Sequence, residues 1–272
     1  MIVDATLNQL KHKKHNQRIR ADELVVRQGL APTKTRAQTL ILSGVVRVGE
    51  SRIDKAGTLV SEQAALWIKE QDHPYVSRGG VKLAGALDDL KINVSGLHCL
   101  DVGASTGGFT DCLLQRGASS VIAVDVGYGQ LAQKLRVDPR VTIHERTNAR
   151  YLSHVQLGKQ VDLTVVDASF ISLQKLGTAL ASCTRIGGYL VALIKPQFEV
   201  GREEASRQKG VIRDPLIRED AISRTKSAMI AYGFHSLSLV PSMLPGPKGN
   251  REVFFYARRI DAPLPTFLSS SR

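Results

Sequence analysis

The sequence has few cysteines, no long apolar run and no apolar leader. Its three cysteines form no CxxC pair and are odd in number, which excludes a disulfide framework and a cysteine-based zinc site. Each lies among apolar residues, so we predict three buried thiols in a reducing compartment. The longest strongly apolar stretch, residues 189–194, is far shorter than the roughly 20 residues of a spanning helix. No apolar segment precedes the first basic run, so we expect no secretory signal.

Positive charge is what the sequence has in excess. The 272 residues include 43% apolar and 23% charged residues, as in an ordinary soluble globular protein, but the formal net charge is +12. Half of this excess lies between Lys11 and Arg36, where eight basic residues stand against two acids. Such a surplus favours a polyanionic partner, with nucleic acid as the first candidate. A basic surface that serves only solubility is the alternative.

The charge and the apolar pattern of the N-terminal part predict a basic flexible arm over residues 1–17, followed by a small α+β module over residues 18–72. Two helix patterns come first and two short strand patterns follow, at residues 21–28, 33–42, 45–48 and 64–68. The text of residues 20–30 and 35–48 resembles the small RNA-binding module that a small-subunit ribosomal protein shares with many pseudouridine synthases.

Four basic residues of this module are the predicted RNA contacts: Arg18, Arg20, Lys34 and Arg36. Lys34 and Arg36 open the second predicted helix, where backbone N–H groups and the helix dipole also favour phosphate. The alternative is a helical hairpin whose basic face is merely solvated.

Residues 81–260 alternate between buried strand patterns and helix patterns, after a predicted linker over residues 73–80 and before a tail over 261–272. The predicted strands cover residues 98–103, 120–125, 141–145, 161–167, 188–195, 234–240 and 252–258. The predicted helices cover residues 82–90, 107–115, 129–136, 173–183 and 215–232. This alternation predicts an α/β domain with a mostly parallel sheet and helices on both faces. The last two strands have no helix between them, so we expect one of them to run antiparallel.

Acids end three of the predicted strands: Asp101, Asp125 and Asp167. Parallel sheets of this kind bind ligands at the carboxyl ends of their strands. The loop after Asp101 has the spacing G-x-x-x-G-G, which allows a ligand to approach the backbone but does not match the G-x-G-x-x-G of nicotinamide sites. Asp125 can accept both hydroxyls of a ribose. The glycine-rich loop and this acid together predict an adenosine-containing cofactor. The alternative for each acid is a helix cap.

Seven longer motifs occur in one order along the chain. They are Ser77-Arg-Gly-Gly-Val-Lys-Leu, Asp101-Val-Gly-Ala-Ser-Thr-Gly-Gly-Phe-Thr, Asp125-Val-Gly-Tyr-Gly-Gln-Leu, Glu145-Arg-Thr-Asn-Ala-Arg, Asp167-Ala-Ser-Phe-Ile-Ser-Leu, Lys195-Pro-Gln-Phe-Glu-Val-Gly and Pro245-Gly-Pro-Lys-Gly-Asn-Arg-Glu. With them, residues 18–259 resemble the TlyA family of ribosomal RNA 2′-O-methyltransferases, long labelled hemolysins, which have an FtsJ-like catalytic domain.

This resemblance implies a Rossmann-like methyltransferase domain with a seven-stranded sheet, S-adenosylmethionine as cofactor, and a ribosomal RNA cytidine as substrate in the cytoplasm. The family modifies the large ribosomal subunit, and its longer members also modify the small one. The basic arm makes action on both subunits a hypothesis. We predict no metal and leave the oligomeric state open.

The family's Lys-Asp-Lys-Glu tetrad falls by motif on Lys82, Asp167, Lys195 and Glu252. A ribose 2′-hydroxyl is a poor nucleophile until its proton is drawn away, and a lysine can accept that proton. Lys195 ends a buried strand and is the predicted base. Lys82 supplies a second positive charge that holds the ribose or a phosphate, and the two acids orient the amines. The alternatives are surface lysines and acids that cap helices or form salt bridges.

Motif positions also assign the cofactor contacts: Asp101, Gly103, Ser105, Thr106, Asp125, Val126, Asn148 and Asp167. One departure from the family lies in the linker, which reads His73-Pro-Tyr-Val76 where some members have Arg-x-Trp-Val. Two functions of other classes compete with the enzyme. A membrane-active hemolysin needs an apolar or amphipathic membrane-binding segment, and none is visible. An RNA-binding assembly factor without catalysis is disfavoured by the complete tetrad.

Overall fold

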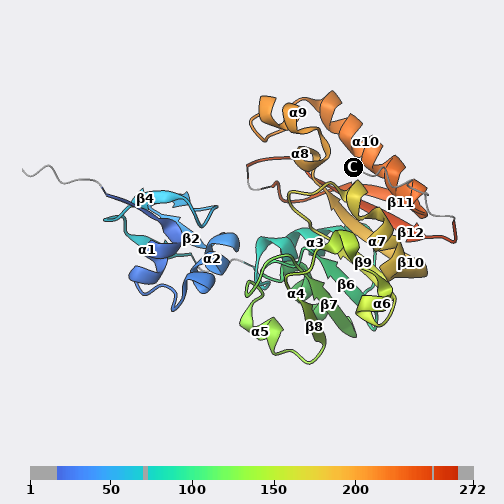
Figure 1. The fold of residues 1–272 in the computed structure, drawn as a ribbon, viewed down its shortest axis with the longest axis horizontal. Helices are drawn as coiled ribbons and strands as arrows, with labels where there is room; N and C mark the ends of the chain where they lie inside the picture. The colour runs from blue at the N-terminus through green and yellow to red at the C-terminus, as the bar shows by residue number, and fades with distance from the viewer. Residues whose placement is uncertain (1–16, 70–72, 247, 263–272) are drawn as a thin grey trace, which may run out of the picture. The chain divides into compact units, whose positions relative to one another are not determined.

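A computed structural model of the chain describes residues 17–69, 73–246 and 248–262. The chain divides into two compact units, of which the first covers residues 1–70 and the second residues 71–272 (Figure 1). The predicted basic arm, except residue 17, and the predicted tail, except residues 261 and 262, lie outside the described residues. Among the residues described, no helix combines the length and the hydrophobicity that crossing a membrane requires.

The first unit packs two helices against short strands. In chain order its elements are β1 (Arg18–Arg20), α1 (Ala21–Arg27), α2 (Lys34–Leu42), β2 (Val46–Val48), β3 (Ser51–Arg52), β4 (Leu59–Ser61) and β5 (Leu66–Ile68). Helix α2 begins where predicted because the Thr33 side chain accepts a hydrogen bond from the Arg36 N–H at 3.1 Å. Leu24, Ile41 and Val46 are buried in a common core. The β1–β4 pair was not predicted, since each strand has three residues of which one is buried.

The second unit contains a seven-stranded sheet in the order β11-β12-β10-β9-β6-β7-β8 (Figure 1). Its strands are β6 (His98–Val102), β7 (Ser120–Val124), β8 (Val141–His144), β9 (Val161–Val166), β10 (Thr184–Ile194), β11 (Phe234–Pro241) and β12 (Val253–Arg259). β12 runs antiparallel to both neighbours, β10 and β11, and the other pairs are parallel. The predicted α/β fold is confirmed, with a mostly parallel sheet in which one of the last two strands of the chain runs antiparallel.

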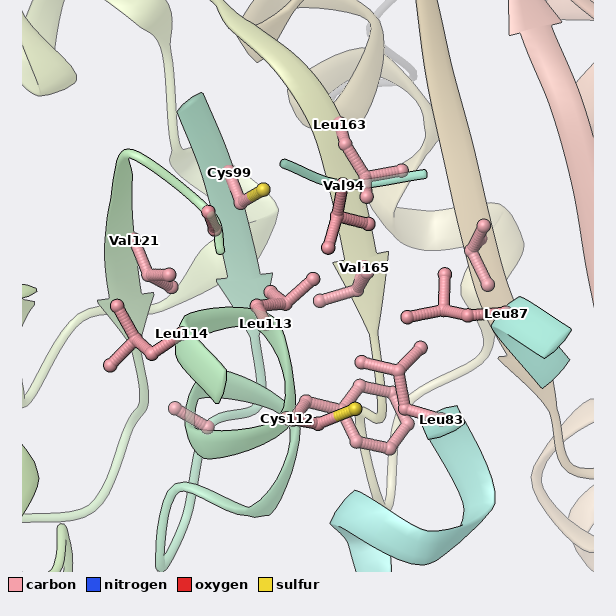
Figure 2. Packing of buried hydrophobic residues seen from close by; sticks show 14 of the residues in the cluster. Leu83, Leu87, Val94, Cys99, Cys112, Leu113, Leu114, Val121, Leu163 and Val165 are labelled. Carbon is pink, nitrogen blue, oxygen red and sulfur yellow. The ribbon is translucent and has the colours of Figure 1, made fainter. Parts of the chain in front are cut away.

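Helices cover both faces of this sheet. They are α3 (Arg78–Asp89), α4 (Gly108–Gln115), α5 (Gln133–Arg136), α6 (His154–Leu157), α7 (Gly177–Cys183), α8 (Pro196–Glu199), α9 (Arg202–Arg207) and α10 (Pro215–Ala231), with 3₁₀ turns η1 (Ala149–Tyr151) and η2 (Leu173–Leu176). Figure 2 shows Leu83 of α3 and Leu113 of α4 near Val165 of β9, in the core on one face. Leu180 of α7 and Met229 of α10 belong to the core on the other face.

The three cysteines lie in these two cores and are free. Cys99 and Cys112 pack in the first core (Figure 2), and Cys183 packs in the second. Burial raises the pKa of each thiol to about 12, so the thiols stay protonated and unreactive at neutral pH. The prediction of three small buried hydrophobes is confirmed.

Several predicted boundaries differ from the structure. The strand predicted over residues 188–195 is β10, which already starts at Thr184, and the helix predicted over residues 173–183 divides into η2 and α7. The helix predicted over residues 129–136 is α5, which starts at Gln133. Gly129 cannot continue a right-handed helix because its φ is +69° and its N–H donates to Glu145 at 2.8 Å. Residues 78–80, assigned to the linker by their glycine pair, form the first turn of α3.

Candidate active site

The carboxyl edge of the sheet brings three predicted catalytic residues together. β10 pairs with β12 so that Ile194 lies opposite Val253. The next residues beyond these strand ends, Lys195 and Glu252, therefore face each other across the same pair. Asp167 follows β9, the parallel neighbour of β10, at the same edge. Sheet register alone thus gathers residues that are far apart in the sequence.

Lys195 and Asp167 form a largely buried ion pair. Lys195 Nζ lies 2.6 Å from Asp167 Oδ1, a contact of charges rather than an aligned hydrogen bond. The same ammonium donates to Ser169 Oγ at 3.0 Å. The Lys195 side chain is 9% exposed and that of Asp167 is 24% exposed, so the carboxylate is the more open side of the pair. β10 ends at Ile194, and Lys195 is the N-cap residue of α8, whose first residue is Pro196.

Lys82 and Glu252 form a second and deeper ion pair. Lys82 Nζ donates to Glu252 Oε2 at 2.6 Å, and the Glu252 side chain has no exposed surface. The other carboxylate oxygen accepts a hydrogen bond from Gln197 Nε2 at 3.1 Å. Because charges this buried are costly to leave unpaired, each side chain holds the other in place. All four predicted tetrad residues thus occur in two ion pairs.

Close backbone packing sets the position of Lys82. Its helix, α3, meets the N-terminus of α4 at two glycines, and a Cβ on Gly80 would lie 2.9 Å from the Gly108 carbonyl oxygen and 2.4 Å from Tyr75. A Cβ on Gly108 would lie 2.2 Å from Ser77 Oγ. The Ser-Arg-Gly-Gly motif is thereby explained, since larger residues would push α3 and its lysine away from the sheet.

Three residues near the tetrad were missed as individuals, although they lie inside the quoted motifs. Gln197 orients Glu252, as described above. Glu199 accepts hydrogen bonds from the Leu173 N–H at 2.8 Å and from Thr225 Oγ1 at 3.1 Å, so it fixes the loop after β9 against α10. Phe170, in that loop, is 92% exposed. The motifs were the only indication in the sequence that these residues matter, and their individual roles can be distinguished only from their contacts.

Phe170 is held in an unusual conformation beside Lys195. Its φ is +65°, a left-handed value that is uncommon for a bulky residue and frequent at functional sites. Its ring centroid lies 5.2 Å from that of Phe198, and Lys195 Nζ lies 5.8 Å from the Phe198 ring. An aromatic face is therefore presented to solvent near the Lys195–Asp167 pair.

Asp101 has one engaged and one unengaged carboxylate oxygen. Oδ2 accepts hydrogen bonds from the Thr110 N–H at 2.9 Å and from Thr110 Oγ1 at 2.6 Å. Oδ1 is buried, and within the described residues nothing donates to it. Burial raises the pKa of Asp101 to about 7, against the Thr110 hydrogen bonds, and the nearby Asp167 charge adds to the rise. An unpaired buried oxygen beside a glycine loop fits a bound donor.

The loop after β6 closes on the neighbouring strand ends. Gly103 has a φ of +86°, and a Cβ there would lie 2.9 Å from the Asp167 carbonyl oxygen, so only glycine fits. Asp125 accepts N–H hydrogen bonds from Ser105 at 2.8 Å and Gly127 at 2.6 Å. Each of its oxygens keeps a further acceptor site for a ribose hydroxyl. Val126 beside it is 70% exposed, which leaves an apolar surface for a base.

Two further predicted cofactor contacts lie nearby without direct evidence of that role. Thr106 is 3% exposed, and its carbonyl accepts the Ala132 N–H at 3.1 Å. Asn148 is exposed and its side chain caps η1 by accepting the Arg150 N–H at 3.0 Å. Both assignments stay predictions.

In the first unit, the predicted RNA contacts divide into paired and unpaired cations. Arg20 donates to both carboxylate oxygens of buried Asp22 at 2.9 and 2.7 Å, and Lys34 donates to Glu23 at 2.8 Å. Arg18 and Arg36 are exposed and make no ion pair with any residue that the structure describes. The unpaired cations are the ones most available to phosphate.

Known proteins resemble the chain over almost its whole length. Residues 75–259 match the FtsJ-like methyltransferase family, and residues 19–66 match the S4 domain. The chain is 46% identical over 243 residues to the 16S/23S rRNA (cytidine-2′-O)-methyltransferase TlyA of Mycobacterium tuberculosis, covering 89% of this chain and 90% of that protein.

Two other similar proteins carry hemolysin names. Hemolysin A of Brachyspira hyodysenteriae is 38% identical, over 86% of this chain and 97% of that protein. The solved structure of a hemolysin-named protein from Streptococcus thermophilus superposes with a TM-score of 0.70 at 38% identity, over 94% of this chain and 93% of that one. The chain therefore belongs to the TlyA family of FtsJ-like methyltransferases and carries an S4 domain in its first unit.

Proposed function

We propose that the protein transfers a methyl group from S-adenosylmethionine to the 2′-hydroxyl of a ribosomal RNA cytidine, with the two ion pairs at the reacting atoms. Membership of the TlyA family confirms the predicted S-adenosylmethionine-dependent rRNA methyltransferase. The observation that supports the residue assignment is the meeting of Lys195–Asp167 and Lys82–Glu252 at one edge of the sheet.

The loop after β6 and the acid after β7 are the residues that would hold the cofactor. Its role is to supply an electrophilic methyl group. Asp101 Oδ1, buried without a donor, suits its amino group, and Asp125 suits its ribose hydroxyls. Val126 offers apolar surface to the adenine. Asp167 is exposed enough to contact the methyl-bearing end.

Lys195 is the base in this proposal. In its neutral amine form it would accept the proton of the 2′-hydroxyl, which would raise the nucleophilicity of that oxygen toward the methyl group that the cofactor would supply. Asp167 and Ser169 fix the position of Nζ. Lys82, held by Glu252, supplies the positive charge that orients the ribose or its phosphate. Positioning therefore carries much of the acceleration.

Phe170 is suited to receive the base of the target nucleotide. Nucleobases stack on exposed aromatic rings, and a target ribose in a folded RNA must leave its helix to reach a recessed lysine. The Phe170 ring is exposed and lies in the loop that contains Ser169, a hydrogen-bond partner of Lys195. A flipped cytidine stacked on Phe170 would bring its ribose near Lys195, the proposed catalytic base.

The S4 domain supplies RNA affinity outside the reacting site. Its unpaired cations, Arg18 and Arg36, are suited to phosphate groups and carry no sequence information by themselves. A cytoplasmic location is part of the proposal and is supported by the ribosomal RNA substrate named for the similar protein of Mycobacterium tuberculosis.

The test is transfer of labelled methyl from S-adenosylmethionine to naked rRNA, separate subunits and whole ribosomes. Lys195→Met is compared with Lys159→Met, an exposed lysine before β9 at the opposite sheet edge. We expect label with the wild type and the Lys159 variant and a loss of at least 100-fold with the Lys195 variant, at unchanged cofactor binding. Equal label in all three would exclude Lys195 as the base.

A further inference from the structure

Two loops outside the tetrad lie together beside the Lys82–Glu252 pair. One covers residues 208–213, between α9 and α10, and the other comprises Gly246 and residues 248–251, before β12. A Cβ on Gly246 would lie 2.5 Å from Glu252 Oε1, so the second loop contacts the tetrad directly.

Asn250 joins the two loops. It is 3% exposed, its Oδ1 accepts the Ile212 N–H at 2.9 Å, and its Nδ2 donates to the Gly210 carbonyl at 2.9 Å. Its own carbonyl accepts the Gly246 N–H at 2.9 Å. A buried amide that satisfies backbone groups of both loops fixes their spacing, because losing any of these bonds would strand a buried polar group.

The joined loops contain four cations and no acid. All four are exposed and form no ion pair with any other part of the chain that the structure describes: Lys209, Arg213, Lys248 and Arg251. Lys248 reaches toward the first loop, since a Cβ on Gly210 would lie 3.5 Å from its Nζ. The acids that follow each loop are engaged elsewhere, because Asp214 caps α10 and Glu252 holds Lys82.

Several other arginines of this unit pair with carboxylates. Arg116 pairs with Asp88, and Arg185 pairs with Asp162. The two joined loops therefore carry four cations without a carboxylate partner among the described residues, next to the Lys82–Glu252 pair. Their positive potential would attract a phosphate group. Arginine in particular binds phosphate oxygens through two parallel hydrogen bonds.

We propose that Lys209, Arg213, Lys248 and Arg251 form a phosphate-binding surface, and that Asn250 sets its geometry. The surface takes phosphodiester groups of the RNA strand that flank the target ribose. This inference rests on the proposed function for the identity of the strand. The four cations hold the strand while the tetrad acts on one sugar, so they contribute to RNA affinity and not to cofactor affinity.

The test compares two variants that each lose three positive charges. The surface variant is Arg213→Gln/Lys248→Gln/Arg251→Gln. The matched control is Lys91→Gln/Lys159→Gln/Arg258→Gln, at exposed positions after α3, before β9 and at the far end of β12. Binding of a dye-labelled single-stranded RNA is measured by anisotropy over a range of salt concentrations, with cofactor binding by calorimetry as the check on folding.

We expect the surface variant to bind the RNA at least about 10-fold more weakly than the control at low salt. Each lost phosphate contact should flatten the plot of log affinity against log salt by about 0.7. KM for ribosomal substrate should rise in parallel, with cofactor affinity unchanged. Equal RNA affinity and equal salt slope in the two variants would overturn the inference.

Asn250→Leu is the second variant, because it keeps all four cations and adds no charge but removes the donor to the Gly210 carbonyl and the acceptor of the Ile212 N–H. We expect the RNA affinity to fall as the loops separate; an unchanged affinity would contradict the role given to Asn250. The outcomes separate the two claims. If the surface variant transfers methyl groups and binds RNA as its control does, only the proposed phosphate-binding surface is refuted. If the wild type binds RNA but transfers no methyl group, only the proposed function is refuted.

Discussion

Gln197 donates a hydrogen bond to the Glu252 carboxylate at 3.1 Å, on the oxygen that Lys82 leaves free. Gln197 lies two residues after Lys195, in the short helix α8. One amide therefore connects the segment that carries the base to the ion pair that holds the second lysine. We therefore propose that the two ion pairs are coupled, and that the coupling runs through a residue that is not itself charged.

Removing this amide should slow methyl transfer more than it weakens RNA binding. Gln197→Met keeps the side-chain length but leaves one Glu252 oxygen without a donor, and a hydrogen bond to a charged group contributes about 1.5–3 kcal/mol. We expect kcat to fall about 10- to 100-fold. The control is Gln208→Met, since Gln208 donates to Glu204 at the same 3.1 Å outside the tetrad. Equal kcat values in the two variants would refute the coupling.

The Lys82–Glu252 pair should show strong non-additivity in stability. Lys82→Met leaves a fully buried carboxylate without its cation, which costs about 3–5 kcal/mol of unfolding free energy. Adding Glu252→Gln removes that charge, so the double variant should regain at least half of the loss while staying inactive. Urea unfolding measures both. Arg224→Met, which breaks the exposed pair with Asp220, should cost about 1 kcal/mol or less. Additive losses at Lys82 and Glu252 would contradict a buried pair.

Gly80 should tolerate no side chain, whereas its neighbour Gly79 should. In Gly80→Ala the new Cβ meets Tyr75 and the Gly108 backbone, and overpacking of this kind costs about 1–3 kcal/mol. The displacement of α3 should also lower methyl transfer, because α3 carries Lys82. In Gly79→Ala the contacts are ordinary, at 3.4 Å or more. Thermal melting and methyl transfer of the two variants test this; similar losses in both would count against the close helix contact.

Asp101 should make the folded protein less stable as the pH rises. Burial raises its pKa to about 7 in the folded state, from an ordinary value near 3.8. The folded state therefore holds this proton more tightly than the unfolded state. The resulting stabilisation is complete below about pH 4 and is lost as the pH rises to about 7. Relative to Asp101→Asn, the wild type should lose roughly 2–3 kcal/mol of unfolding free energy between pH 5 and 8.

Asp88→Asn is the control for this pH dependence. The Arg116 guanidinium lowers the pKa of Asp88, so Asp88 is ionised in both states over that range. Its difference from the wild type should be flat between pH 5 and 8. A wild-type curve parallel to that of Asp101→Asn would show that Asp101 is ionised throughout.

The sheet could be predicted from the sequence because it depends on local patterns, whereas the tetrad was assigned by resemblance to the motifs of a family and stays a prediction. Strands β7, β9 and β10 are apolar at their carboxyl ends and are followed directly by Asp125, Asp167 and Lys195, and parallel pairing carries those ends to one edge. Very short helices could not be predicted from the sequence. Helices α8 and α9 have four and six residues, too few for a recognisable apolar period.

The individual roles within the motifs also depend on contacts that spacing does not encode. Nothing in the text of residues 195–201 separates Gln197, which reaches Glu252, from Glu199, which reaches Thr225. Asn250 satisfies backbone groups about 40 residues earlier in the chain, a distance at which local patterns carry no information. The exposure of Phe170 follows from its left-handed backbone, which the sequence does not reveal.

The position of the transferred methyl group tests the central claim most directly. Ribosomal RNA labelled by the wild-type protein is hydrolysed with alkali, which needs a free 2′-hydroxyl to cleave the adjacent phosphodiester. The account predicts that the label survives in an alkali-resistant dinucleotide whose 5′ residue is cytidine, and that Lys195→Met yields none. Label recovered in single nucleotides would place the methyl group on a base and contradict the account.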